Sequence, residues 1–72
     1  MQKRSAQQIS FTNRERQLLE LMTIHNGLRP EELSMRSGIP IQNVLSLLTE
    51  MELKQWVHME PGNFYQCMIV PF

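Results

Sequence analysis

The stretch from residue 30 to residue 65 most constrains the fold, because several elements follow one another in it with almost no spare residues. Pro30 suits the first position of a helix, where its missing amide would be unpaired in any case. Gly38 can adopt the left-handed conformation that closes a helix, so a short helix is predicted from about Pro30 to Ser37. Pro40 is then expected to start another helix.

The helix after this corner is predicted to bury one stripe and to run to about Lys54. Its apolar residues recur at i, i+3, i+4 and i+7, which places them on one face of an α-helix. Leu33 of the preceding helix is the expected partner across the corner, and Ile39 is expected to pack inward. The residues of the stripe are Val44, Leu47, Leu48 and Met51.

Two short segments, residues 56–60 and 64–68, flank the turn residues Pro61-Gly62-Asn63. This pattern predicts a β-hairpin. Its aromatic residues could stack on nucleic-acid bases, but a hairpin this small needs them to cover the core, so a structural role is the expectation. These residues are Trp56, Phe64 and Tyr65.

A further helix is predicted upstream. Thr12 and Glu15 have the spacing of a capping box, in which each side chain accepts from a backbone amide of the other residue. The helix should therefore begin near Asn13, with Phe11 packing against its first turn from outside. Asn26-Gly27 should end it.

Three helices followed by a hairpin wing are the order of a winged helix-turn-helix, a small α+β fold that presents its third helix to nucleic acid or protein. The sequence predicts a flexible arm or linker over residues 1–10, the winged-helix domain over 11–68 and a C-terminal tail over 69–72. A chain of 72 residues can hold one small core and no large enclosed active site.

The chain resembles the C-terminal winged-helix domain of the DprA/Smf DNA-processing family over roughly residues 12–66. The resemblance is carried by Glu-Glu-Leu-Ser-Met-Arg-Ser-Gly-Ile-Pro at 31–40, Val-Leu at 44–45, Met-Glu-Leu at 51–53 and Pro-Gly-Asn-Phe-Tyr at 61–65. In that family a dinucleotide-fold domain binds single-stranded DNA and helps load the recombinase during natural transformation, and the winged helix is an accessory module. The resemblance implies that this chain is a piece of such a protein.

Two departures from related domains bear on the expected function. Gln55 stands where the family usually has glycine, so the third helix must end by another device or accept strain there. Related Z-DNA-binding modules read DNA with lysine, asparagine and tyrosine, where this chain has Ile41, Leu45 and Thr49. Recognition of left-handed DNA is therefore not expected.

Charge argues against strong DNA binding, because seven basic residues balance seven acidic ones. The basic residues outnumber the acidic ones up to Arg36, and the reverse holds after it, so any phosphate contact should come from the first half. A basic strip there could follow a phosphate backbone, although scattered surface charge is the expected account. Its members are Lys3, Arg4, Arg14 and Arg16.

The outward side of the predicted third helix carries two kinds of candidate residue. Polar candidates for DNA contact are Gln42, Asn43, Ser46, Thr49 and the terminal Lys54. Because Glu50 and Glu52 would repel phosphates, a solvated helix face is favoured over sequence-specific reading. Aliphatic candidates for protein contact are Ile41, Leu45 and Leu53, unless the tail or the first helix covers them.

Other functions have little support in the sequence. His25, His58 and Cys67 are too few and too scattered for a zinc site, so no metal is expected. No nucleophile motif or glycine-rich phosphate loop is present, so neither a cofactor nor catalysis is expected. A single cysteine, six methionines and the lack of a long apolar run fit a cytoplasmic protein without a membrane span.

Three hypotheses of function remain. The first is an accessory module that contacts DNA weakly or a partner protein, with single-stranded DNA, a recombinase and a second copy of the chain as candidate partners. The second is an interaction or oligomerisation module without DNA binding. The third is the DNA-binding domain of a transcriptional regulator, which would need a dimerisation helix that this length hardly provides.

Overall fold

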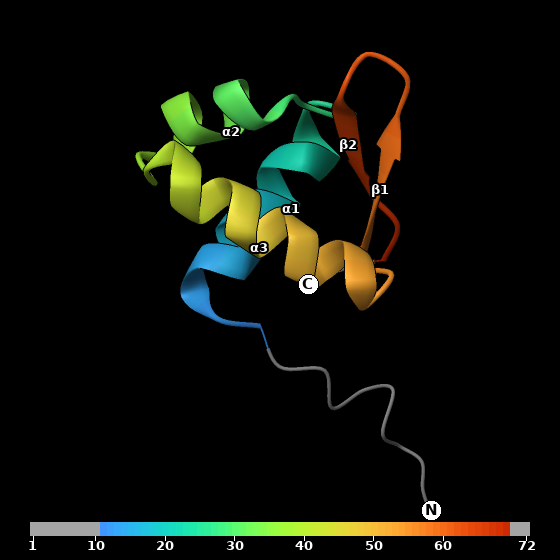
Figure 1. Ribbon diagram of the computed structural model, residues 1–72, viewed down its shortest axis with the longest axis horizontal. Helices are drawn as coiled ribbons and strands as arrows, with labels where there is room; N and C mark the ends of the chain where they lie inside the picture. Colours follow the sequence, from blue (N-terminus) through green and yellow to red (C-terminus); the bar gives the residue numbers. More distant parts are fainter. Residues whose placement is uncertain (1–10, 70–72) are drawn as a thin grey trace, which may run out of the picture.

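The computed structural model describes residues 11–69 and contains three helices and one β-hairpin. The three helices pack around a common core, with α3 in front of α1, and the hairpin lies beside them (Figure 1). The predicted winged helix-turn-helix fold is confirmed. The predicted arm over 1–10, with Lys3 and Arg4, and residues 70–72 of the predicted tail lie outside the described residues. The elements are α1 (Asn13–Ile24), α2 (Pro30–Ser37), α3 (Ile41–Leu53), β1 (Val57–Glu60) and β2 (Phe64–Cys67).

α1 begins with the predicted capping box. The amide of Glu15 donates to Oγ1 of Thr12 at 3.1 Å, and the amide of Thr12 donates to Oε1 of Glu15 at 2.9 Å. These two bonds pair amides that a helix start leaves unsatisfied. The helix ends at Ile24, slightly before Asn26-Gly27, and Asn26 adopts a left-handed φ of 59° in the turn that follows.

α2 also begins and ends as predicted. Pro30 is its first residue, and the amide of Arg29 donates to Oε1 of Glu32 at 3.1 Å. Gly38 closes the helix with a left-handed φ of 80°. The corner differs in one detail from the prediction, because Pro40 is the residue before α3 and the helix itself starts at Ile41.

The core is built from all three helices, the α1–α2 link, the α2–α3 corner and β1. In the stripe of α3, Val44, Leu48 and Met51 are buried as predicted, whereas Leu47 is half-buried at the edge of the core. The stripe packs with Leu33 and Ile39, as expected across the corner. The complete buried apolar set is Leu18, Leu19, Met22, Leu28, Leu33, Ile39, Val44, Leu48, Met51 and Val57.

The wing is an antiparallel hairpin in which Val57 pairs with Cys67 and Glu60 with Phe64. Its strands are one residue shorter at their outer ends than the sequence suggested. The link before α2 adds a short bridge to it, because the amide of Leu28 donates to the carbonyl of Tyr65 at 3.2 Å and the amide of Tyr65 returns a bond to Leu28 at 2.8 Å. This bridge fixes the wing beside the helices.

α3 ends in a Schellman motif whose left-handed residue is Gln55 instead of glycine. The amide of Gln55 donates to the carbonyl of Glu52 at 2.9 Å, and that of Trp56 donates to the carbonyl of Met51 at 2.8 Å. Gln55 has a φ of 65°. The helix therefore ends by the usual hydrogen bonds and accepts backbone strain at one residue.

Replacing Gln55 by glycine should raise the free energy of unfolding by roughly 0.5–1 kcal/mol, because glycine adopts this φ without a Cβ clash. Urea denaturation followed by the fluorescence of Trp56, the single tryptophan, measures the change. Gln55→Ala is the matched control: it removes the polar side chain but keeps the strain, so its stability should stay near that of the parent. A loss of stability in Gln55→Gly would contradict the strain.

Candidate interaction surfaces of the wing and third helix

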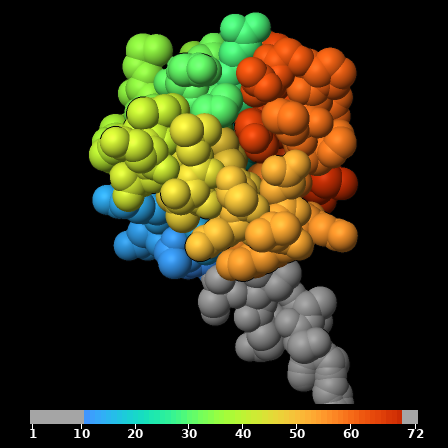
Figure 2. Space-filling view, viewed as in Figure 1, coloured from blue at the N-terminus to red at the C-terminus, as the bar shows by residue number. Residues whose placement is uncertain are grey.

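The outward side of α3 is exposed as predicted. Gln42, Asn43, Ser46 and Thr49 all reach solvent, and α3 runs across the face of the molecule in Figure 2. The hydroxyl of Thr49 donates to the carbonyl of Leu45 at 2.9 Å and is therefore already bonded within the helix. α3 contains no lysine, arginine or histidine. Its polar side can offer hydrogen bonds but no positive charge.

Lys54 follows the end of α3, where a free cation could have met a phosphate. Its Nζ instead lies 3.6 Å from Oε2 of Glu15 and 4.4 Å from the centroid of the Trp56 ring. Phe11 and Trp56 form an edge-to-face pair, with the ring centroids 4.9 Å apart. The predicted DNA candidate Lys54 therefore ties the end of α3 to the start of α1, and the carboxylate of Glu15 offsets its charge.

The remaining basic candidates that the structure describes lie on α1. Arg14 and Arg16 are exposed in the first turns of the helix, and the guanidinium carbon of Arg16 lies 5.8 Å from the centroid of the Phe11 ring. That phosphate contacts would come from this first half of the chain stays a prediction. The two arginines are separate from the polar residues of α3 in sequence and lie on another helix.

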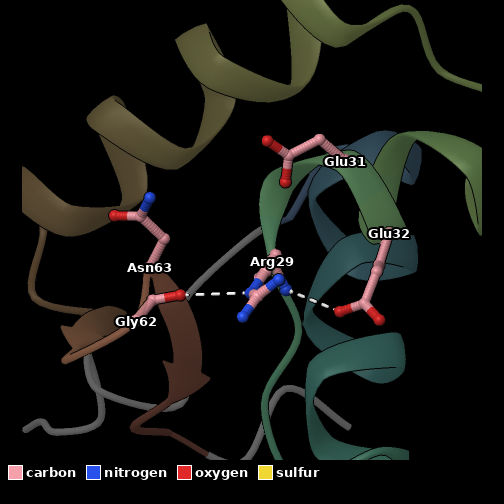
Figure 3. Close-up of a pocket in the computed structure, with 5 residues that line it drawn as sticks. All are labelled: Arg29, Glu31, Glu32, Gly62 and Asn63. Atoms are coloured by element: carbon pink, nitrogen blue, oxygen red, sulfur yellow. Dashed lines mark hydrogen bonds between the residues drawn. The ribbon is translucent and has the colours of Figure 1, made fainter.

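Arg29 is a functional candidate that sequence analysis missed. Its Nε donates to the carbonyl of Gly62 at 3.2 Å, and its guanidinium carbon lies 4.9 Å from the centroid of the Phe64 ring. Figure 3 shows Arg29 reaching from the start of α2 to the turn of the wing. No local pattern could reveal this contact, because the bonded residues are 33 positions apart. The wing tip is thus fixed against α2.

A cleft of about 460 Å³ lies between the start of α2 and the wing turn (Figure 3). Arg29, the basic group of this cleft, is already bonded to the wing, whereas Glu31 is exposed. This charge distribution disfavours a phosphate. The lining residues are Arg29, Glu31, Glu32, Gly62 and Asn63.

The three aromatic residues in and beside the hairpin differ in burial: two pack against the core and one is more exposed. Trp56 and Tyr65 are half-buried and pack against the core, as expected. Phe64 lies on the opposite face of the wing from Tyr65, since neighbouring residues of a strand alternate, and is 36% exposed beneath Arg29. The structural role predicted for these rings therefore describes Trp56 and Tyr65 better than Phe64.

The aliphatic candidates on α3 all reach solvent, to different extents. Ile41 is 37% exposed, Leu45 is 47% exposed and Leu53 is 80% exposed. Leu53 is therefore largely open to solvent, whereas Ile41 and Leu45 are partly covered. With Glu50 and Glu52 also exposed, α3 presents a mixture of aliphatic and acidic side chains.

Two of the three residues considered for metal binding, His58 and Cys67, interact with other groups of the chain. Nε2 of His58 lies 3.3 Å from Oε2 of Glu60, and the thiol of Cys67 donates to the carbonyl of Ile69 at 2.9 Å. Across residues 11–69, no three side chains of histidine, cysteine, aspartate or glutamate come together as a metal site. Within the same residues, no helix has the length and apolar character needed to cross a membrane.

The pKa of Tyr65, the single tyrosine, is affected by a charged residue of α3. Burial raises the pKa of the Tyr65 phenol above 10.0, and the carboxylate of Glu52 raises that pKa further. The folded state therefore holds the phenolic proton more tightly than the unfolded state does. This contribution to stability is complete below pH 10.0 and is lost as the pH rises through the raised pKa.

Removing the charge of Glu52 by Glu52→Gln should lower the titration midpoint of Tyr65 part of the way back toward 10.0, because burial remains the larger cause. The ultraviolet absorbance of tyrosinate measures it without interference from a second tyrosine. Glu50→Gln, two residues earlier on the same helix, is the control and should leave the midpoint unchanged. A parent midpoint at 10.0 would contradict the assignment.

Comparison with known proteins identifies the family. A family model described as the DprA winged helix domain matches residues 2–63. The chain belongs to this family. No curated protein and no solved structure matches it. The DprA match confirms the resemblance seen in the sequence. The domain boundaries proposed from composition, at residues 11 and 68, stay a prediction.

Membership of the DprA winged helix family connects this chain with DNA processing. Winged helix domains typically act by binding DNA or protein and are typically non-catalytic. The surface of α3 bears on that choice, because this helix, which a winged helix usually presents, exposes aliphatic, acidic and uncharged polar side chains and no basic one.

Proposed function

We propose that this chain is the accessory winged-helix module of a cytoplasmic DprA-like DNA-processing protein and contacts a partner protein through α3. Single-stranded DNA handling and recombinase loading during natural transformation would then belong to the rest of that protein. The observation that carries this proposal is the exposed side of α3, which holds Ile41, Leu45 and Leu53 together with glutamates and uncharged polar residues and has no basic residue.

The balance of energies favours protein over DNA at this surface. Fully burying an exposed leucine side chain contributes roughly 1.5–3 kcal/mol. Leu53, 80% exposed, could contribute most of that, and Leu45, 47% exposed, about half of it. DNA would instead meet Glu50 and Glu52, whose carboxylates oppose phosphates, and would find Lys54 already paired with Glu15. Hydrogen bonds from Gln42 and Asn43 would have to offset that repulsion.

A weak DNA contact is the second candidate, and the position of Arg14 and Arg16 favours it. Both residues are exposed at the start of α1, where a phosphate backbone could pass without meeting the glutamates of α3. Such binding would be independent of sequence and would fall steeply with salt. It does not need the polar side of α3.

The test titrates the chain with the recombinase of the same cell and, separately, with a single-stranded oligonucleotide at about 50 and 200 mM salt. Salt-tolerant association with the recombinase that Leu45→Ser or Leu53→Ser weakens is the expected result. Ile24→Ser is the matched control, because Ile24 is 72% exposed but lies at the end of α1.

Three other outcomes would count against the proposal. Strong salt-sensitive DNA binding that Arg14→Gln or Arg16→Gln removes would instead favour the DNA candidate. Weakening of the recombinase complex by Ile24→Ser as much as by the α3 variants would remove the assigned surface. A tight dimer in sedimentation, with sequence-dependent duplex binding, would favour a transcriptional regulator.

A further inference from the structure

A second cleft lies where the end of α3 meets the base of the wing, and neither the fold nor the predicted sites account for it. Its volume is about 340 Å³. Its lining combines two apolar side chains with a carboxylate, a carboxamide and an imidazole. The lining residues are Glu52, Gln55, Val57, His58 and Met68.

The strained residue of the fold lines this cleft. Asn26, Gln55 and Asn63 are the described residues other than glycine that have a positive φ. Asparagine tolerates this conformation because its short side chain can bond locally, whereas glutamine has no such advantage. Since glycine would end α3 without strain, the side chain of Gln55 costs stability at the position where it reaches the cleft. Backbone strain of this kind is concentrated at functional sites.

Glu52 brings to the cleft a negative charge that no cation of the described chain neutralises. Lys54 is close in sequence, but its ammonium pairs with Glu15. His58 lies against Glu60. The ion pairs among residues 11–69 therefore leave Glu52 out, and its field is felt at Tyr65 on the neighbouring strand. An added cation would meet an uncompensated carboxylate here.

We propose that this cleft receives an arginine side chain from the partner protein. The inference rests on the proposed function, in which the module binds protein. The guanidinium would donate to the carboxylate of Glu52 and to the side-chain oxygen of Gln55, and its aliphatic stem would cover Met68, which is 61% exposed. Two acceptors lining the same cleft suit the planar fork of arginine better than the single ammonium of lysine.

The experiment titrates the isotope-labelled chain with an end-blocked hexapeptide, Gly-Ser-Leu-Arg-Gly-Ser, and follows backbone amide shifts by NMR. We expect millimolar binding with shifts concentrated at Glu52, Gln55, His58 and Met68. The same peptide with citrulline in place of arginine keeps the shape and removes the charge. It should bind about tenfold more weakly, because hydrogen bonds to charged groups are the stronger ones.

Matched variants locate the site. Glu52→Gln should weaken the arginine peptide about tenfold, whereas Glu50→Gln, with the same change of net charge on the same helix, should not. Gln55→Gly should also weaken the peptide although it stabilises the fold, so a loss of binding there cannot be caused by unfolding. Gln55→Ala should weaken it to a similar extent.

Several results would overturn the arginine site: no shift at millimolar peptide, equal binding of the citrulline peptide, or equal loss in Glu50→Gln and Glu52→Gln. If the peptide fails while the recombinase binds through Leu45 or Leu53, the cleft assignment falls and the protein-binding module stands. If the peptide binds as expected while the recombinase does not, the cleft is supported and the recombinase is removed as its partner.

Discussion

Replacing Leu48 by alanine is expected to lower the free energy of unfolding by about 2–5 kcal/mol. Leu48 is 1% exposed and lies in the stripe by which α3 packs on the other helices. Alanine would remove buried methyl groups and leave a cavity that a small core can only partly fill. A domain of this size has little stability to lose, so much of the variant should be unfolded at physiological temperature.

The control for this prediction is Leu53→Ala on the same helix. Leu53 is 80% exposed, so the same chemical change should alter stability by no more than about 0.5 kcal/mol. Urea denaturation read by Trp56 fluorescence and by circular dichroism gives both values. Equal losses at Leu48 and Leu53 would mean that α3 does not bury the stripe observed here.

Replacing Glu15 by alanine should lower the free energy of unfolding by roughly 1–3 kcal/mol, the second largest effect expected. Glu15 is 5% exposed; it caps the amide of Thr12 at 2.9 Å and lies 3.6 Å from the ammonium of Lys54. Removing it leaves a helix-start amide without its acceptor and a lysine without its counterion. Thermal and urea unfolding measure the loss.

Two variants separate the parts of this effect. Glu15→Gln keeps an oxygen for the cap but removes the charge, and it should cost less than about 1 kcal/mol because Lys54 is half exposed to solvent. Glu20→Ala, further along α1 and half-buried, is the control for helix propensity and should be nearly neutral. If Glu15→Ala lowered the free energy of unfolding no more than Glu20→Ala, the cap and the ion pair would not stabilise the fold.

The elements that sequence analysis located correctly are those with local causes. A capping threonine and its glutamate are three residues apart, and a glycine closes α2 through its own backbone freedom. The apolar stripe of α3 follows from helical periodicity alone. The predicted ends of elements differ from the observed ones by one or two residues, as at Pro40, which precedes α3. Such differences depend on which backbone hydrogen bond is the first or last of the helix.

Residue type and spacing point to the candidate residues. They do not show whether a candidate side chain is already engaged in a contact within the fold. Lys54 was a reasonable DNA candidate until folding placed Glu15 and the Trp56 ring beside it. The role of Arg29 could not be predicted from the sequence, because its contact with Gly62 joins distant parts of the chain. Contacts of this kind depend on which distant segments meet in the fold, and no local pattern encodes that.

The sequence by itself determined the three helices, the hairpin, the buried stripe and the family, because helix caps, turn residues and hydrophobic period act within a few residues of one another. The tertiary structure alone decided which charges are neutralised and where clefts form. It paired Lys54 with Glu15 and left Glu52, beside Gln55 in the second cleft, without an ion pair within residues 11–69, since electrostatic partners are chosen by distance in space.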